Sequence, residues 1–272
     1  MTTASTMLMP TAVARPLSQT LTIYWKEVKC EFLTRLRLRA YSLATIGFPV
    51  MFYVLFGLVL NSKDAAIGST HFATYLIATY GTFGVMGASL FGTAGGLAAE
   101  RGLGWLQVKR ASPMPPFAYF AAKVAMSVIF SAIVVLLLFT LGVTLGGVHL
   151  SPAETIKLLG TLVLGSLPFC ALGLAIGYFA GPNSAVAIIN LIYLPLSFCS
   201  GLWVPLTFLP NLLQKFAHVL PPYHLSQLAL GIVGGGQHES NWIHWEVLIG
   251  FTLICLGVAR IGFQRDEGKM YG

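Results

Sequence analysis

Long stretches without any charged residue constrain this chain more than any other feature of its sequence. A membrane-crossing helix needs about 20 mostly apolar residues to span roughly 30 Å of hydrocarbon. Five stretches meet this requirement and contain no Asp, Glu, Lys or Arg: 41–60, 72–97, 124–148, 158–180 and 185–204. Only 9% of the 272 residues are charged, against about 25% in soluble proteins. We therefore expect an all-α membrane protein.

A sixth apolar stretch, at about 242–259, is less clean because His244 and Glu246 lie near its start. We place its first turn at the outer membrane interface, where a solvated role for both groups is favoured over a role in proton transfer. The sequence thus predicts six transmembrane helices within a domain at 41–263. It also predicts a flexible cytoplasmic N-terminus at 1–16 and a cytoplasmic tail at 264–272.

The positions of the basic residues predict how the spans are oriented. With a cytoplasmic N-terminus, all but three of the 16 Lys and Arg residues fall on cytoplasmic segments, the exceptions being Lys63, Lys157 and Lys215. The positive-inside rule then places both termini in the cytoplasm of a multi-pass protein of the inner (plasma) membrane. The net charge of +7 is thereby explained by contact with membrane lipid, and we expect no nucleic-acid partner.

The segment before the first span has the pattern of an amphipathic helix. Apolar residues such as Leu21, Trp25 and Phe32 recur at helical spacing within 17–40, and basic residues, including Arg35, occupy other faces. A helix of this kind lies along the inner leaflet, where anionic headgroups attract it. The alternative is a basic juxtamembrane segment without a mechanical role.

Residues 100–123 form the longest polar stretch on the predicted cytoplasmic side. Their sequence predicts a helix exit at Glu100 and Arg101, a short helix around 103–108, and a rigid break at the prolines that follow. Because proline is tolerated in the first turn of a helix, Pro116 can begin the third span.

Residues 205–242 are too apolar for a free loop and too interrupted for a full span. Prolines and glycines divide them into two candidate short helices, at about 210–220 and 224–233. Backbone at membrane depth has to be covered by protein or face water, so we expect a re-entrant helical pair that dips into the outer leaflet. The residues that mark this pair are Pro210, Pro221, Tyr223 and His224. For His224, a capping or interface role is favoured over a ligand role.

Motifs that would energise transport are not found in the sequence. There is no G-x-x-x-x-G-K-[ST] loop for nucleotide phosphates, so the chain is not expected to be an enzyme or to bind a cofactor. The six histidines lack paired ligand spacing, so no metal site is expected. The five charge-free spans also lack the buried ionisable groups on which ion-coupled carriers depend.

Two stretches and the order of the parts resemble the permease subunits of type-2 ABC exporters. The first stretch is similar to the family's glutamate, short coupling helix, proline turn and lysine, and consists of Glu100, Gly104, Leu106, Ser112, Pro113 and Lys123. The second is similar to the end of the family's fifth span, and consists of Leu194, Pro195, Ser200, Gly201, Pro205, Leu209 and Pro210. The likeness extends over about residues 17–263. Residues 220–224 only approximate the family's N-P pattern, which leaves the substrate class open.

The resemblance implies a homodimer, or a pair of like subunits, bound by two cytoplasmic ATP-binding-cassette ATPase subunits that carry ATP and Mg. A coupling helix at 102–110 would seat in a groove of the ATPase. The implied coupling residues are Glu100, Arg101, Gly104, Trp105, Leu106, Val108, Lys109 and Arg110. The implied translocation path lies between the subunits, and its lining residues are Phe83, Phe91, Leu194, Phe198 and Trp203. Ordinary helix packing or lipid contact is the alternative for this last set.

The expected function is therefore ATP-driven export of a hydrophobic or amphiphilic compound, drug or lipid-like, from the cytoplasm or inner leaflet. Export of a lipid-linked glycan or polysaccharide by the same architecture is the first alternative. An ion-coupled secondary transporter, a membrane scaffold and an intramembrane enzyme are alternatives from other classes.

Overall fold

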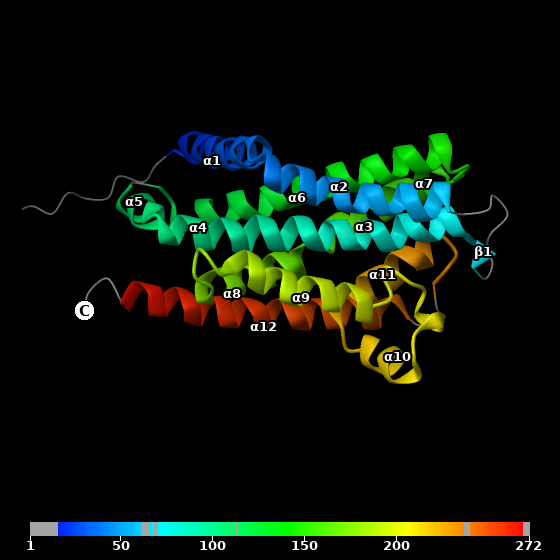
Figure 1. Cartoon of the computed structure of the whole chain (residues 1–272). Helices are drawn as coiled ribbons and strands as arrows, with labels where there is room; N and C mark the ends of the chain where they lie inside the picture. The colour runs from blue at the N-terminus through cyan, green and yellow to red at the C-terminus, as the bar shows by residue number, and fades with distance from the viewer. Residues whose placement is uncertain (1–15, 61–65, 68–69, 113, 237–239, 269–272) are drawn as a thin grey trace, which may run out of the picture.

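The computed structural model describes residues 16–60, 66–67, 70–112, 114–236 and 240–268. Over these residues the chain is helical apart from loops and a hairpin of β1 (Ala66–Ile67) and β2 (Thr70–His71), and the long helices run side by side (Figure 1). Five helical stretches are long and apolar enough to cross a membrane, and Ala185–Cys199 is a shorter apolar helix. The all-α membrane class is thus confirmed, while the count of six spans stays a prediction.

The first half of the chain contains two interrupted membrane-length stretches, preceded by α1 and followed by the short α5. In order, its helices are α1 (Leu17–Arg37), α2 (Arg39–Phe52), η1 (Tyr53–Val59), α3 (Phe72–Leu90), η2 (Phe91–Gly95), α4 (Gly96–Gly102) and α5 (Trp105–Ala111). The helix expected at 17–40 ends early, because the backbone leaves helical geometry at Leu38 with a ψ of 86°. The segments η1 and η2 are π-helical, a form that often marks functional positions.

The second half contains the remaining spans and the short helices between them. Its helices are α6 (Pro116–Leu145), α7 (Pro152–Leu164), α8 (Leu167–Phe179), α9 (Ala185–Cys199), η3 (Leu206–Phe208), α10 (Asn211–Ala217), α11 (Pro221–Ile232) and α12 (Asn241–Gly268). Helix α6 begins at Pro116, as predicted. Helices α7 and α8 form one stretch with a break before Pro168, and α7 begins with a capping box between Ser151 and Glu154.

Several helix ends differ from those expected. The second and third spans extend past their charge-free stretches, so Glu100 and Arg101 lie on α4 and Lys123 lies on α6. The expected span at 185–204 is helical only to Cys199, because the chain turns at Gly201 with a φ of +73°. Helix α12 continues beyond residue 263 to Gly268. The first part of the tail predicted at 264–272 is therefore helical, and residues 269–272 of that tail and 1–15 of the predicted N-terminus lie outside the described residues.

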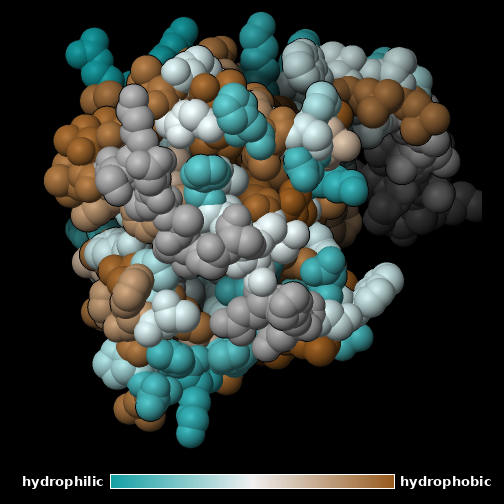
Figure 2. Space-filling view, turned by 90° about the vertical axis from the view of Figure 1, so that its right-hand side faces the viewer, coloured by the Kyte–Doolittle hydropathy of each residue, from teal (hydrophilic) through white to brown (hydrophobic). Residues whose placement is uncertain are grey.

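Helix α3 forms the centre of the bundle. Every residue from Ala73 to Leu90 is buried, and α3 contacts α2, α6, α8 and α11. In Figure 1, α5 and the C-terminal end of α12 lie at one end of the bundle, and β1 and α10 lie at the other. We call these the α5 end and the α10 end. Figure 2 looks onto the α10 end, where hydrophilic and hydrophobic residues are interspersed.

Close packing of α8 on the second span depends on glycine. A Cβ atom at Gly173 would lie 1.8 Å from Thr93 Oγ1, whereas a Cβ at Gly160 on α7 would meet nothing within 4 Å. Replacing Gly173 by alanine should therefore lower the free energy of unfolding by about 1–3 kcal/mol, the usual range for overpacking. Gly160→Ala is the matched control and should be neutral or slightly stabilising, as measured by the thermal midpoints of the two purified variants. Equal midpoints would contradict the packing account.

Candidate functional site

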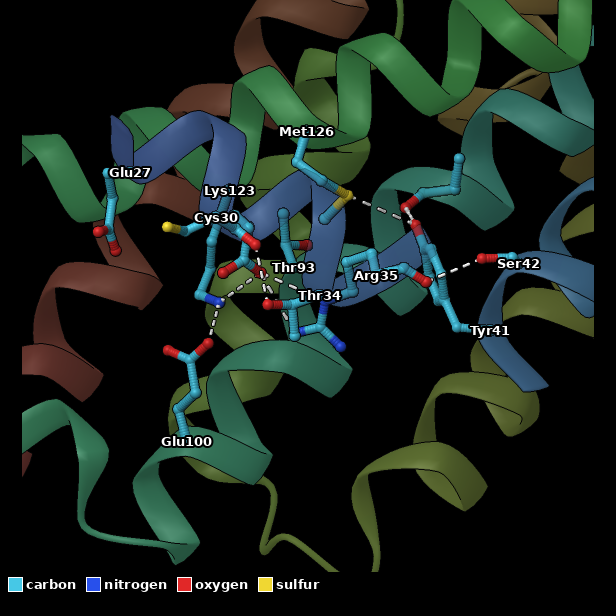
Figure 3. Close-up of polar contacts among 12 residues, drawn as sticks. Glu27, Cys30, Thr34, Arg35, Tyr41, Ser42, Thr93, Glu100, Lys123 and Met126 are labelled. Atoms are coloured by element: carbon cyan, nitrogen blue, oxygen red, sulfur yellow. Dashed lines mark hydrogen bonds and ion pairs between the residues drawn. The ribbon is translucent and has the colours of Figure 1, made fainter. Parts of the chain in front are cut away.

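Four charged side chains meet inside the protein at the α5 end, and we call them the ionic cluster: Glu31 and Arg35 of α1, Glu100 of α4, and Lys123 of α6. Lys123 Nζ donates to Glu31 Oε1 at 3.0 Å and to Glu100 Oε1 at 2.9 Å. Arg35 Nε and Nη2 both reach the same Glu31 oxygen, at 3.2 and 3.3 Å. Figure 3 shows Lys123 directed toward Glu100, with Arg35 on the side of Tyr41. The cluster thus joins α1 and the cytoplasmic-side ends predicted for spans two and three.

Three members of the ionic cluster are buried, Glu100 is partly exposed, and the four charges balance. Lys123 is fully buried, and Glu31 and Arg35 are only 5% and 7% exposed. Burial by itself would raise the pKa of Glu31, but the charges of Lys123 and Arg35 and the hydrogen bond from Lys123 outweigh it and hold the pKa below its ordinary value of 4.5. Because buried charges are costly unless each is paired, loss of any member leaves its partners uncompensated.

Local sequence explains how these groups come together. Glu31 and Arg35 are four residues apart on α1 and so share one helix face. Gly96 lets that face approach span two, since a Cβ there would lie 2.0 Å from Arg35 Nη2. Lys123 enters the cluster because α6 begins at Pro116 and carries it two turns into the bundle.

The lowered pKa of Glu31 predicts an acid-sensitive contribution to stability. Its ionised form is stabilised in the folded protein, so the contribution is complete above pH 4.5 and is lost as the pH falls through the lowered pKa. Glu31→Gln should therefore lower the thermal midpoint at pH 7, and the gap to the unsubstituted protein should narrow below pH 4.5. A gap that stays constant down to pH 3 would contradict this assignment.

Helix α5 carries the residues expected to couple to an ATPase. It follows Gly104, whose φ of +73° lies in the left-handed region that favours glycine. Trp105 and Val108 are 55% and 59% exposed, but Leu106 is buried in a hydrophobic cluster that also contains Tyr119 and Leu174. Leu106 therefore anchors α5 to its own bundle, and Trp105 and Val108 present an apolar face outward.

Two further charged residues hold α5 and α4 in place. Lys109 of α5 pairs with Glu27 of α1 and lies 4.8 Å from the ring centroid of Tyr119. The side chain of Arg110 lies outside the described part of the structure. Arg101 donates to Asp266 of α12 at 2.8 Å and to the Gly177 carbonyl at the end of α8 at 2.9 Å. The two basic side chains of the α5 region that are described, Arg101 and Lys109, therefore both bind within the chain itself.

A cavity of about 660 Å³ opens beside the ionic cluster, between α2, the second span and α9. On the second span its lining residues recur every fourth position from residue 83 to residue 99, so the cavity follows that helix for about 24 Å. The walls are rich in aromatic side chains, namely Tyr41, Phe48, Phe52, Phe83, Phe91, Tyr193 and Trp203. Phe83 stacks on Tyr193 with ring centroids 4.8 Å apart. Arg35 lines the cavity at its α5 end.

The residues implied for the translocation path mostly gather at this cavity. Phe83, Phe91, Leu194 and Trp203 line it. Phe198 is not among the lining residues and is 40% exposed on α9. The structure thus brings four of the five together at one cavity. Of these, Phe83 is only 2% exposed, so most of its surface packs against neighbouring side chains.

At the α10 end, the short helices meet the start of α12 through a buried histidine pair. Tyr223 and His224 lie in the first turn of α11, which begins at Pro221, and α10 follows Pro210. His224 Nδ1 lies 2.8 Å from His244 Nδ1, and its Nε2 lies 2.9 Å from the His218 carbonyl. The expected solvated position is wrong for His244, which is 2% exposed, because α11 covers it. Glu246, on the next face of α12, is exposed as expected.

Sequence reasoning missed Glu27, Glu31 and Asp266. The signal for the first two was available, because two carboxylates four residues apart are unusual in a helix that otherwise suits anionic lipid. Glu31 lies one helical turn from Arg35, which is typical of paired charges, whereas Glu27 has no basic residue three or four positions away and pairs with Lys109 of α5. Asp266 lay within the part of the sequence taken as a tail, so its contact with Arg101 could not be anticipated.

Comparison with known proteins agrees with this architecture. Residues 18–233 match the family described as ABC-2 type transporter. The chain is also 27% identical to the Bacillus subtilis (strain 168) protein named "Putative transport permease YvfS" over 234 residues, which cover 85% of this chain and 93% of that protein. The family match covers well over half of the sequence and includes the ionic cluster, α5 and the cavity. The chain is a multi-pass membrane permease of the ABC-2 type transporter family, whose members work with an ATP-binding subunit.

Proposed function

We propose that this permease exports a hydrophobic or amphiphilic compound, drug or lipid-like, using ATP and Mg bound on a separate ATPase subunit. The observation that carries the proposal is the position of the cavity, which shares Arg35 of α1 and the second span with the ionic cluster. A cavity of this length suits an apolar chain or ring system. Movement of α5 would reach it without any nucleotide site in this chain.

The contacts of α5 support its role as the coupling helix. It is short, follows a glycine turn, and is tied to α1 through Lys109 and Glu27 and to the bundle through Leu106. A rigid connection of this kind transmits motion as a displacement of whole helices. Trp105 and Val108 remain exposed for a partner. Because only the short turn at Leu103 and Gly104 separates α4 from α5, displacement of α5 would also displace Glu100 and, through their ion pair, Lys123.

The assembly we propose is a homodimer, or a pair of like permease subunits, with two ATPase subunits in the cytoplasm. The α5 end would face the cytoplasm with both termini, and the α10 end would face outward, in the inner (plasma) membrane. The distribution of Lys and Arg supports this orientation. Export of a lipid-linked glycan is a second candidate, since a groove of about 24 Å on span two accepts the lipid part of such a molecule equally well.

The proposal is tested by filling the cavity. Val186 lines it and is 55% exposed, whereas Leu191 on the same helix does not line it and is 75% exposed. The probes are two NBD-labelled amphiphiles with the same alkyl chain, one ending in a hydroxyl and one in a phosphate. In nanodiscs with the copurified ATPase, Val186→Trp should weaken stimulation of ATP hydrolysis by the better probe about tenfold, and Leu191→Trp should not.

Basal ATP hydrolysis should be unchanged by Leu191→Trp, because Leu191 does not line the cavity. If neither amphiphile stimulates hydrolysis, or if the two tryptophan variants behave alike, the cavity is not the substrate site.

A further inference from the structure

The cavity has one charged residue among the described residues that line it, and that residue is Arg35. The other lining residues are apolar or uncharged, and Thr45 and Asn190 supply a hydroxyl and an amide besides the tyrosines. Arg35 lies at the α5 end, together with Ala99 and Pro182. The cavity is therefore amphiphilic along its length, with a cation at one end and aromatic walls beyond it.

The guanidinium of Arg35 is paired with Glu31, but this pair does not use all of its N–H donors. Its Nε and Nη2 share a single oxygen of Glu31, and that oxygen also accepts from Lys123. Among the described residues, Nη1 of Arg35 makes no hydrogen bond. Arginine has five N–H donors arranged to match the oxygens of phosphate or carboxylate. Donors thus remain for a ligand that enters the cavity.

The surroundings of Arg35 favour an anion over a cation. Arg37 and Arg39 are exposed at the same end of α1 and add positive charge there. Glu31, which could attract a cation, is 5% exposed and does not line the cavity. An anionic group that reached Arg35 would leave Glu31 paired with Lys123 at 3.0 Å, so no member of the ionic cluster would lose its last partner.

We propose that the cavity binds an amphiphile with an anionic headgroup, a phosphate or a carboxylate, with the headgroup on Arg35 and the apolar chain along the aromatic wall. This inference rests on the proposed function and specifies its substrate class. The headgroup competes with Glu31 for Arg35. Binding of substrate therefore acts on the ionic cluster and, through Lys123, on Glu100 at the end of the second span.

The test compares the two NBD-labelled amphiphiles in nanodiscs of neutral phosphatidylcholine that contain the full chain, with empty nanodiscs subtracted. The phosphate should bind at least tenfold more tightly than the alcohol of the same chain, by fluorescence anisotropy. Arg35→Gln should remove this preference, while Arg37→Gln, at an exposed position on the same helix, should keep it. Inorganic phosphate at the same concentration should not displace the amphiphile, because it lacks the chain; displacement would show a simple anion site and overturn the inference.

A second variant separates recognition from a loss of folding. Glu31→Gln removes the competitor of the headgroup, so it should strengthen binding of the phosphate amphiphile, whereas mere destabilisation would weaken it. Equal binding of phosphate and alcohol, unchanged by Arg35→Gln, would overturn the headgroup assignment and leave the cavity as a substrate site. Binding of neither amphiphile would contradict the proposed function itself, as expected if a second copy of the chain fills the cavity.

Discussion

Replacing Lys123 by methionine should strongly destabilise the protein. Lys123 is fully buried and pairs with two carboxylates. Its removal leaves Glu31 with Arg35 alone and Glu100 without its partner. Breaking a buried ion pair by removing one member costs about 3–5 kcal/mol. The thermal midpoint of the purified protein, and the yield of correctly inserted protein, should both fall.

The matched control for this prediction is Lys29→Met, an exposed lysine on α1, which should change the midpoint little because surface charges contribute about 1 kcal/mol or less. The double variant Lys123→Met with Glu100→Gln should recover part of the loss, since it removes the carboxylate left unpaired. Equal midpoints for the two methionine variants would mean that Lys123 is not an essential part of the ionic cluster.

Alanine at Trp105 should weaken binding of the ATPase, whereas alanine at the neighbouring Leu106 should lower the stability of the permease. Trp105 is exposed, so its loss should leave stability unchanged but weaken binding of the copurified ATPase subunit roughly 30-fold or more, as for a tryptophan that costs about 2 kcal/mol or more at an interface. Leu106 is buried, so its loss should lower the free energy of unfolding by about 2–5 kcal/mol. Titration of the permease with the ATPase and thermal unfolding measure the two effects.

The two substitutions also act as controls for one another. If Trp105→Ala lowers stability as much as Leu106→Ala does, the tryptophan packs on its own chain. If it leaves ATPase binding intact, α5 does not contribute its exposed face to the partner and the coupling assignment is wrong.

Helix positions could be predicted from the sequence because lipid imposes a simple length rule. The charge-free stretches fall on helices of the structure, and Pro116 marked the start of α6. Helix ends were predicted less well. A window that excludes charge stops at residue 97 or starts at residue 124, although α4 continues through Glu100 and α6 already includes Lys123, and these two side chains pair. An ion pair lowers the cost of burying the two charges, so a span need not end at them. Which charges pair depends on the tertiary structure and could not be predicted from the sequence.

The candidate site could likewise be predicted only where it depends on local sequence, and not where it depends on contacts between distant segments. Hydrophobic spacing identified α1 as amphipathic, but it could not tell that Arg35 faces the bundle rather than lipid, because that depends on Gly96 of the second span. The path residues were inferred from the resemblance, and four of the five line one cavity. His244 was misplaced because α11 packs against the start of α12 and places His224 beside it, which no local pattern in α12 reveals.

The source of energy for transport can be measured directly. The NBD-labelled phosphate amphiphile is followed in sealed vesicles that contain the permease alone, or the permease with its copurified ATPase and Mg-ATP, each with and without a protonophore. Accumulation against a gradient should require the ATPase and Mg-ATP and should be insensitive to the protonophore. Accumulation by the permease alone, driven by an imposed proton gradient and abolished by the protonophore, would contradict an ATP-driven permease.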